Sequence, residues 1–299
     1  MQIGMIGLGR MGMNMSRRWL KGGHEVVAYN RSQGKVKILE QEGGVGSESI
    51  ADQIEKLTKP RILWIMLPAA TVDDHIDKVA PMMADGDLIV DGGNTNYKND
   101  IRRAEGLSAR GIRYMDAGVS GGVWGLQNGY CTMVGGERSD FERVEPLLKT
   151  LAPKDGYLYC GPAGAGHFVK MVHNGIEYAM MQSYGEGCEI LKASPYAEGL
   201  DLGKIAHLWN QGSVIRSWLL ELLETAFEKD PNLESIKGYV EDSGEGRWTV
   251  EQAIESGVPA TSIAHSLFAR FRSREQDSFS DKVLAALRNE FGGHEVKKS

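Results

Sequence analysis

The sequence predicts an α/β protein in which a doubly wound sheet is followed by an all-α helical domain. Three observations lead to this prediction. Short apolar runs alternate with amphipathic stretches in the first half, a glycine-rich turn follows the first run, and apolar residues recur at helical spacing beyond Gly166. Alternating β and α units indicate a mostly parallel sheet with helices on both faces. We therefore expect two domains, residues 1–163 and 164–299.

The expected strands of the first domain are six short apolar runs. They are Ile3–Ile6, Val26–Tyr29, Ile62–Leu67, Leu88–Val90, Tyr114–Gly118 and Thr132–Val134. In the second domain, apolar residues at helical spacing predict helices over 168–191, 205–227 and 250–267. Polar or glycine-rich stretches at 229–232, 243–246 and 272–277 are the expected breaks.

The composition argues against several other classes of protein. The chain has 299 residues, 34 Lys and Arg against 40 Asp and Glu, and 41% hydrophobic residues, as in ordinary soluble globular proteins. A net charge of −6 gives no long-range attraction to nucleic acid or an anionic membrane, and no apolar run is long enough to cross a bilayer. Three scattered cysteines, Cys131, Cys160 and Cys188, fit neither a disulfide framework nor a zinc site. We expect a cytoplasmic protein with no bound metal and no nucleic-acid or membrane partner.

A glycine motif of the form GxGxxG lies between the first expected strand and the first expected helix. In this context Gly7 permits a tight turn, Gly9 lets the backbone approach a pyrophosphate, and Gly12 allows close helix packing. The helix that follows would offer its N-terminal N–H groups to the phosphates. The motif predicts a Rossmann-type dinucleotide site rather than a purely structural turn. Its cofactor-binding residues are Gly7, Leu8, Gly9, Arg10, Met11 and Gly12.

The end of the second expected strand indicates which dinucleotide binds. An NAD site usually has Asp or Glu there, whereas this sequence has Asn30, Arg31 and Ser32, with Lys35 close behind. A carboxylate would repel the 2′-phosphate of NADP, and these residues attract it. We predict NADP as the cofactor, with NAD or dual specificity as the alternative if Arg31 is only a solvated loop residue.

Five polar residues of different chemistry share one face of the helix expected over 168–191. They are Lys170, His173, Asn174, Glu177 and Tyr178, at i, i+3, i+4, i+7 and i+8. The first and last are about 12 Å apart along the axis, which suits a sugar-sized ligand. An exposed amphipathic face with a Lys–Glu pair is the alternative. Apolar residues on the other faces favour a buried helix with a polar seam.

Three motifs occur together in this chain: the glycine turn Gly7–Gly12, the segment Asp116–Gly122 (DAGVSGG) and the segment Lys170–Tyr178 (KMVHNGIEY). Together they resemble the decarboxylating 6-phosphogluconate dehydrogenases, a family within the β-hydroxyacid dehydrogenases. The first two motifs occur across that superfamily, and the third is specific to the phosphogluconate enzymes. The resemblance covers nearly the whole chain, which is similar to the shorter form of the family.

The resemblance implies oxidative decarboxylation of 6-phospho-D-gluconate to D-ribulose 5-phosphate and CO₂ in the pentose phosphate pathway, without a metal. It implies that Lys170 accepts the proton of the 3-hydroxyl and later returns a proton, and that Glu177 protonates C1 of the enediol. Tyr178 and Arg270 correspond to phosphate-binding positions. The positions implied for the sugar acid are Asn94, which also lies at the cofactor, and Ser120, Gly121, Gly122, His173 and Asn174.

The phosphate site departs from the family pattern at one position. The longer enzymes carry a lysine where this chain has Ser243, and Arg247 nearby could be a solvated turn residue. The C-terminal segment resembles the family's tail, in which an arginine and a histidine, here Arg288 and His294, reach the neighbouring subunit's substrate. We therefore expect a homodimer with shared sites, or alternatively a tetramer.

Two other functions remain open at this stage. One is a different β-hydroxyacid dehydrogenase, such as one acting on 3-hydroxyisobutyrate, but an oxidation without decarboxylation has no need of a second proton donor such as Glu177. The other is a non-catalytic Rossmann protein that binds a dinucleotide, which an intact seam of Lys170 and Glu177 disfavours.

Overall fold

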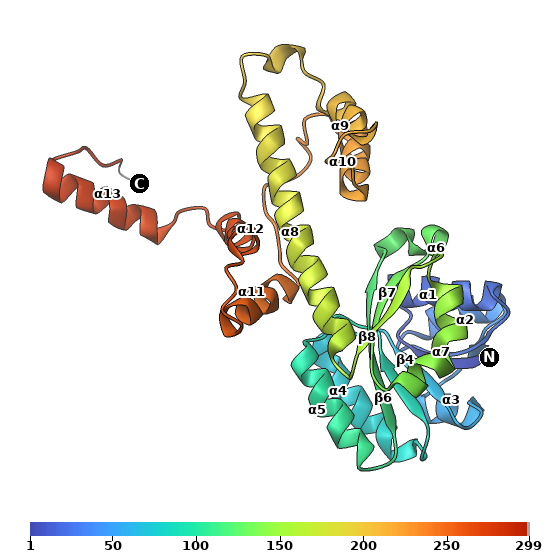
Figure 1. Ribbon diagram of the computed structural model, residues 1–299. Coiled ribbons are helices and arrows are strands. Elements are labelled where there is room, and N and C mark those ends of the chain that lie inside the picture. The colour runs from blue at the N-terminus through green and yellow to red at the C-terminus, as the bar shows by residue number, and fades with distance from the viewer. Residues whose placement is uncertain (298–299) are drawn as a thin grey trace. The chain divides into compact units, whose positions relative to one another are not determined.

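The computed structural model describes residues 1–297 (Figure 1). The chain divides into two compact units, Met1–His173 and Asn174–Ser299. The division falls inside one long helix, α8 (Ala165–Lys192). We describe each unit by itself.

The first unit is built on one eight-stranded sheet with the strand order β3-β2-β1-β4-β5-β6-β7-β8. The strands are β1 (Gln2–Ile6), β2 (Glu25–Tyr29), β3 (Val45–Gly46), β4 (Ile62–Ile65), β5 (Leu88–Asp91), β6 (Arg113–Ser120), β7 (Cys131–Gly135) and β8 (Tyr157–Gly161). All neighbours run parallel except β6 and β7, which are antiparallel. The predicted α/β sheet is confirmed.

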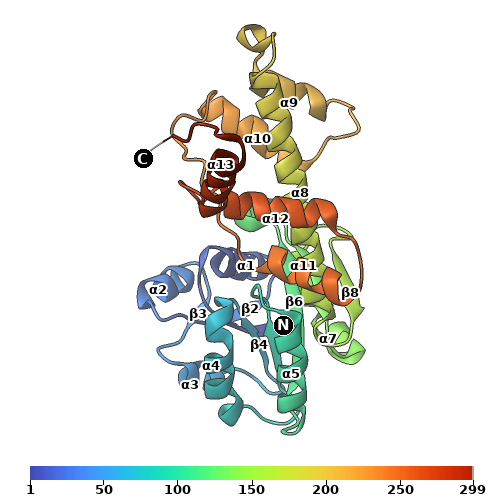
Figure 2. The same ribbon diagram turned by 90° about the vertical axis from the view of Figure 1, so that its left-hand side faces the viewer.

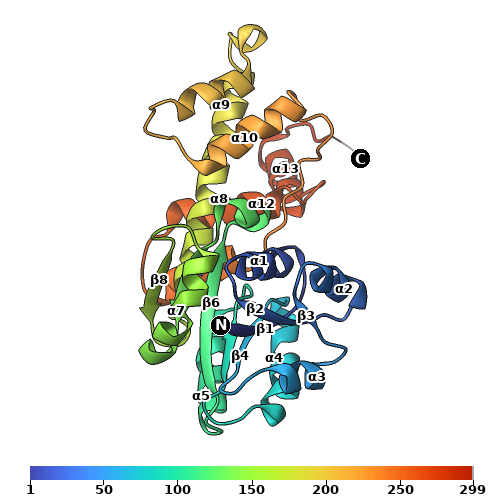
Figure 3. The same ribbon diagram turned by 90° about the vertical axis from the view of Figure 1, so that its right-hand side faces the viewer.

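Helices cover both faces of this sheet and bury alternate strand residues. The helices α1 (Arg10–Lys21), α2 (Gln33–Gln41) and α7 (Arg138–Leu151) pack on one face, where Trp19 meets Trp64 at 5.3 Å between ring centroids. The helices α3 (Ile50–Lys56), α4 (Ala69–Val79) and α5 (Tyr97–Ser108) pack on the other. Figure 2 shows α4 and α5 in front of the sheet, and Figure 3 shows α1 and α7 on the opposite face. A short helix, α6 (Gly125–Asn128), precedes β7.

The sequence predicted six of the eight strands. It missed β3, which has only two residues, and β8, whose Leu158 is 66% exposed, so that neither presents a buried apolar run. The expected strand over 62–67 ends at Ile65, before the turn that contains Pro68.

The second unit is helical. After α8 come α9 (Leu202–Asn210), α10 (Trp218–Lys229), α11 (Glu245–Glu255), α12 (Thr261–Arg272) and α13 (Phe279–Gly292). Among residues 1–297, no helix has the length and apolar character needed to cross a membrane. The predicted all-helical second half is confirmed.

Two of the predicted helices are wrong as continuous elements. The helix expected over 205–227 is interrupted near Gly212, at φ +89°, and α10 starts where Ser217 Oγ accepts from the backbone N–H of Leu220 at 3.1 Å. The helix expected over 250–267 is interrupted at Gly257, at φ +66°, just before Pro259. A left-handed glycine ends a helix even where the apolar spacing continues.

Candidate active site

The turn between β1 and α1 has the shape that a dinucleotide requires. Gly7 has φ +98°, and a Cβ at Gly12 would lie 2.0 Å from the carbonyl oxygen of Gly7. A Cβ at Gly9 would meet nothing within 4 Å, so the backbone there is open to an approaching group. Gly9 also precedes α1 without a side-chain cap on the helix N-terminus. These residues fit a pyrophosphate held by backbone N–H groups.

The end of β2 lies beside this turn. Asn30 Oδ1 accepts from the backbone N–H of Leu8 at 2.9 Å, and Asn30 Nδ2 donates to the carbonyl oxygen of Ser32 at 3.1 Å. Asn30 therefore shapes the loop, whereas the side chains of Arg31 and Ser32 are exposed, as is Arg10. Met11 is partly buried against the core of the sheet.

The loop after β5 presents Asn94 on the surface. Asp91, at the end of β5, holds this loop: its Oδ1 accepts from the N–H of Gly93 at 3.0 Å and its Oδ2 from the hydroxyl of Thr95 at 2.8 Å. The loop is thus fixed from inside the protein, while Asn94 itself is exposed.

Lys170 lies against β6. A Cβ at Gly118 would lie only 2.3 Å from the Cβ of Lys170, so that α8 packs directly on the strand backbone. The residue is 6% exposed, and its Nζ lies 3.4 Å from Nδ1 of His173. Nε2 of His173 in turn lies 3.4 Å from Oγ of Ser120. The structure therefore brings three of the predicted site residues together within the first unit.

Two glycines follow Ser120 in left-handed conformations. Gly121 has φ +143° and Gly122 has φ +51°, which side chains other than glycine rarely adopt. They turn the chain directly after Ser120, next to His173.

The start of α8 is held by the carboxylate of Asp116, to which the sequence analysis assigned no role of its own. Asp116, in the middle of β6, accepts from the backbone N–H of Gly164 at 2.6 Å and from that of His167 at 2.7 Å. Burial raises the pKa of Asp116 to about 6, although the nearby His167 cation and these hydrogen bonds act in the opposite direction. An aspartate in the middle of the expected strand Tyr114–Gly118 was the available signal, because a carboxylate buried in a sheet needs partners.

In the second unit, the ring of Tyr178 is packed closely between Gly246 and Arg270. A Cβ at Gly246 would lie 2.5 Å from its ring, and the guanidinium of Arg270 lies over the ring at 3.5 Å from the centroid. The tyrosine hydroxyl accepts from the backbone N–H of Ser243 at 3.1 Å. Tyr178, Arg270 and Ser243, which lie far apart in the sequence, are therefore neighbours. In the same unit Asn174 is buried and Glu177 is partly exposed.

The other cations considered for the phosphate have different surroundings. Arg247 donates to both carboxylate oxygens of Asp242, at 2.6 and 3.0 Å, and the hydrogen bond from Arg247 is the main cause of the lowered pKa of Asp242. Arg288, on α13, and His294, just after it, are exposed. Within the second unit they are thus placed on the surface, and Arg247 is already paired.

Comparison with known proteins agrees with this geometry. The model of the NAD binding domain of 6-phosphogluconate dehydrogenase matches residues 2–161, and that of the 6-phosphogluconate dehydrogenase C-terminal domain matches residues 166–298. The chain belongs to the 6-phosphogluconate dehydrogenase family. The resemblance noted in the sequence is confirmed, and the chain is an oxidoreductase of this family with a dinucleotide-binding domain.

Individual members of the family match over the full chain. A provisionally named 6-phosphogluconate dehydrogenase of Bacillus subtilis (strain 168), YqeC, is 48% identical and is covered over 100% of both chains. The NAD(+)-dependent, decarboxylating 6-phosphogluconate dehydrogenase of Haloferax volcanii is 44% identical over 100% of this chain and 99% of its own. The structure of Plasmodium falciparum 6-phosphogluconate dehydrogenase has a TM-score of 0.83 and 29% identity, over 100% of this chain and 66% of that one.

Proposed function

We propose that this chain catalyses the oxidative decarboxylation of 6-phospho-D-gluconate to D-ribulose 5-phosphate and CO₂, as a cytoplasmic enzyme of the pentose phosphate pathway. The strongest support is the position of Lys170, which is buried against Gly118 beside His173 and Ser120. A lysine ammonium is rarely buried without a role, because burial of its charge is costly.

Lys170 is the acid and base of the first two steps. A bound dinucleotide would supply the nicotinamide that accepts a hydride from C3. As the bond between C3 and its hydrogen breaks, Lys170 accepts the proton of the 3-hydroxyl. The product of this step is a 3-keto acid. The protonated lysine then stabilises the developing enolate while CO₂ leaves, because the ketone oxygen takes up the electron pair.

Glu177 is the proposed proton donor to C1 of the enediol, two helical turns beyond Lys170 on α8. We predict that Glu177→Gln loses most of the exchange of deuterium or tritium at C1 of ribulose 5-phosphate, while reduction of the cofactor is partly retained. Glu189→Gln, at an exposed position of the same helix, is the matched control and should leave both unchanged. Unaltered exchange in Glu177→Gln would remove Glu177 from this role.

The substrate's other groups have proposed partners on the same elements. Hydroxyl and carboxylate groups bind at Asn94, Ser120, Gly121, Gly122, His173 and Asn174. The phosphate binds at Tyr178 and Arg270, where a guanidinium already lies on the tyrosine ring and can present its planar edge to a dianion. We assign the role to Arg270 and not to Arg247, because Arg247 is paired with the carboxylate of Asp242.

We propose NADP as the preferred cofactor because Arg31 is exposed at the end of β2, where a 2′-phosphate would lie. The Haloferax volcanii relative is named as NAD(+)-dependent, so both dinucleotides must be compared. Arg31→Asp should reverse the preference in kcat/KM, since a carboxylate repels the 2′-phosphate and accepts from a free 2′-hydroxyl. Lys37→Asp, an exposed change on α2, controls for the altered charge. A wild-type preference for NAD would show that Arg31 has no such role.

We propose further that the enzyme is a homodimer whose tails complete the neighbouring sites. In the single chain, α13 has no buried residue. Its large apolar side chains Phe279, Val283, Leu284, Leu287 and Phe291 are between 41% and 79% exposed. A second copy of the chain would cover them and would bring Arg288 and His294 to the partner's substrate.

The test of the function is the reduction of NADP or NAD, followed by absorbance, with 6-phosphogluconate and with 3-hydroxyisobutyrate as separate substrates. We expect turnover with the first, with release of CO₂ in equal amount, and none with the second. Turnover of 3-hydroxyisobutyrate alone would assign a different β-hydroxyacid dehydrogenase activity. Binding of the dinucleotide without turnover of either would indicate a non-catalytic protein.

A further inference from the structure

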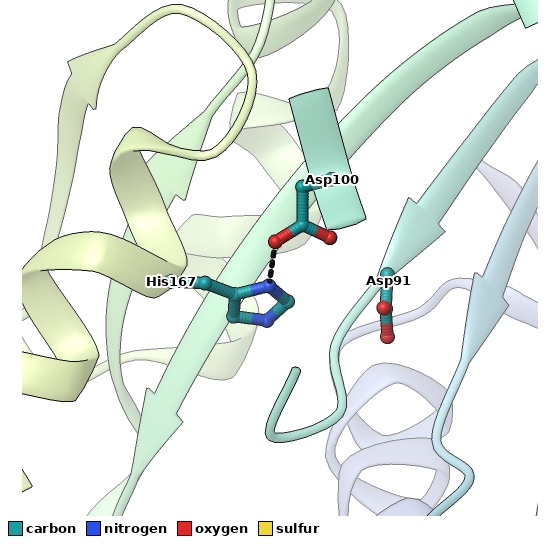
Figure 4. A group of neighbouring side chains, drawn as sticks. All are labelled: Asp91, Asp100 and His167. Carbon is teal, nitrogen blue, oxygen red and sulfur yellow. Dashed lines mark hydrogen bonds and ion pairs between the residues drawn. The ribbon is translucent and has the colours of Figure 1, made fainter. Parts of the chain in front are cut away.

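A buried ionic network lies at the start of α8 in the first unit. Asp91, Asp100, Arg103 and His167 are all at most 4% exposed. Nη1 of Arg103 lies 2.9 Å from Oδ2 of Asp91 and 3.5 Å from Oδ1 of Asp100. Nδ1 of His167 lies 2.7 Å from Oδ2 of Asp100, and Figure 4 shows the imidazole directed at that carboxylate. The four side chains thus connect β5, α5 and α8.

The imidazole of His167 is positively charged in this network. Burial by itself lowers the pKa of His167, but the carboxylates of Asp100, Asp91 and Asp116 outweigh it and raise the pKa to about 10. The contact with Asp100 is short, 2.7 Å, and charge-assisted pairs of this kind are stronger than neutral hydrogen bonds.

This pair holds the first turn of α8 through the side chain of His167. Asp116 fixes the same turn on its backbone side, through the N–H groups of Gly164 and His167. Lys170 follows His167 by three residues, one turn further along the same helix. The first turn is consequently held at two points, directly before the residue that performs the proton transfer.

Small rotations of this helix would have large effects at the ammonium. A Cα lies about 2.3 Å from the helix axis and an extended lysine adds roughly 6 Å, so a rotation of about 7° moves Nζ by about 1 Å. A misplacement of about 1 Å can cost on the order of 100-fold in rate.

We propose that Asp100 and His167 are positioning residues for Lys170: their buried ion pair sets the rotation of α8 and so places the lysine for proton transfer. The inference rests on the proposed function, because it concerns the lysine of that reaction. Asp100 and His167 touch neither substrate nor cofactor in this proposal. Their loss should therefore lower kcat and leave KM nearly unchanged.

The test compares two substitutions at His167 with one at Tyr114. His167→Leu removes the partner of Asp100, whereas His167→Asn keeps an N–H donor at about the position of Nδ1. Tyr114→Phe is the matched control, because its hydroxyl donates to the other oxygen of Asp100 at 2.7 Å and does not connect to α8. We expect His167→Leu to lose at least about tenfold in kcat with KM changed less than about threefold. His167→Asn should recover most of this loss, and Tyr114→Phe should keep the wild-type kcat despite a lower Tm.

Hydrogen exchange of the amides of residues 164–173 provides a second readout that needs no turnover. Exchange there should be faster in His167→Leu and in Asp100→Asn than in wild type, and unchanged in Tyr114→Phe. The proposal is overturned if exchange is the same in all variants, or if kcat simply follows Tm across the set. If the wild type does not oxidise 6-phosphogluconate, the proposed function fails, and the exchange data still decide whether the ion pair orders α8.

Discussion

Lys170→Met should bind the dinucleotide and 6-phosphogluconate and transfer no measurable hydride. The 3-hydroxyl then has no acceptor for its proton, and general base catalysis of this kind contributes about 10² to 10⁴ in rate. Methionine has a similar length and keeps the packing on Gly118, so the fold should survive. Single-turnover measurements of nicotinamide absorbance, together with ligand titrations, separate the loss of chemistry from a loss of binding.

The control for this variant is Lys192→Met, which makes the same substitution at an exposed position near the end of α8. It should be indistinguishable from wild type. Turnover of Lys170→Met within roughly tenfold of wild type would correspond to little more than 1.4 kcal/mol of barrier and would exclude Lys170 as the base.

Arg288→Ala combined with His294→Ala should raise the KM for 6-phosphogluconate by several orders of magnitude. Each side chain makes a proposed charge-assisted contact to the phosphate worth on the order of 1.5 to 3 kcal/mol. Ser243 offers no positive charge, so the proposed binding of the phosphate depends more on these two residues. Glu290→Ala on the same helix is the matched control and should leave KM unchanged.

Mixing this double variant with Lys170→Met distinguishes tails that act across the interface from tails that act within a chain. If they act across it, each mixed dimer has one intact site, and random mixing of equal amounts should give about a quarter of wild-type activity. If they act within the chain, every site stays defective. The absence of recovered activity, once mixed dimers have been demonstrated by mass, would contradict shared sites.

Buried elements were easier to predict from the sequence than exposed ones. The strand Ile62–Ile65 is buried at every residue, and such a continuous apolar run is easily recognised. The strand Tyr157–Gly161 lies at the edge of the sheet, with no residue fully buried, so its sequence has no comparable pattern. Helix ends were harder, because apolar spacing continues past Gly212 and Gly257, and the backbone conformation of a single glycine decides the break.

The candidate site was predictable where its residues share one helix. The spacing of Lys170 and His173 predicted their proximity because helical geometry fixes it. The contacts of Asp116 with the start of α8 join residues 48 and 51 positions apart, and the pair of Asp100 and His167 spans 67 positions. Local periodicity cannot predict such pairs, because they depend on how the sheet and the helices are assembled.

The exposed apolar face of α13 has a thermodynamic consequence. A helix of 14 residues is only marginally stable in water by itself, and this one buries none of its side chains in the single chain. If a second copy covers that face, the helix gains its order in the same event that joins the subunits. Folding of the last segment then becomes coupled to association, and the total protein concentration, rather than the sequence of the segment alone, sets what fraction of it is helical.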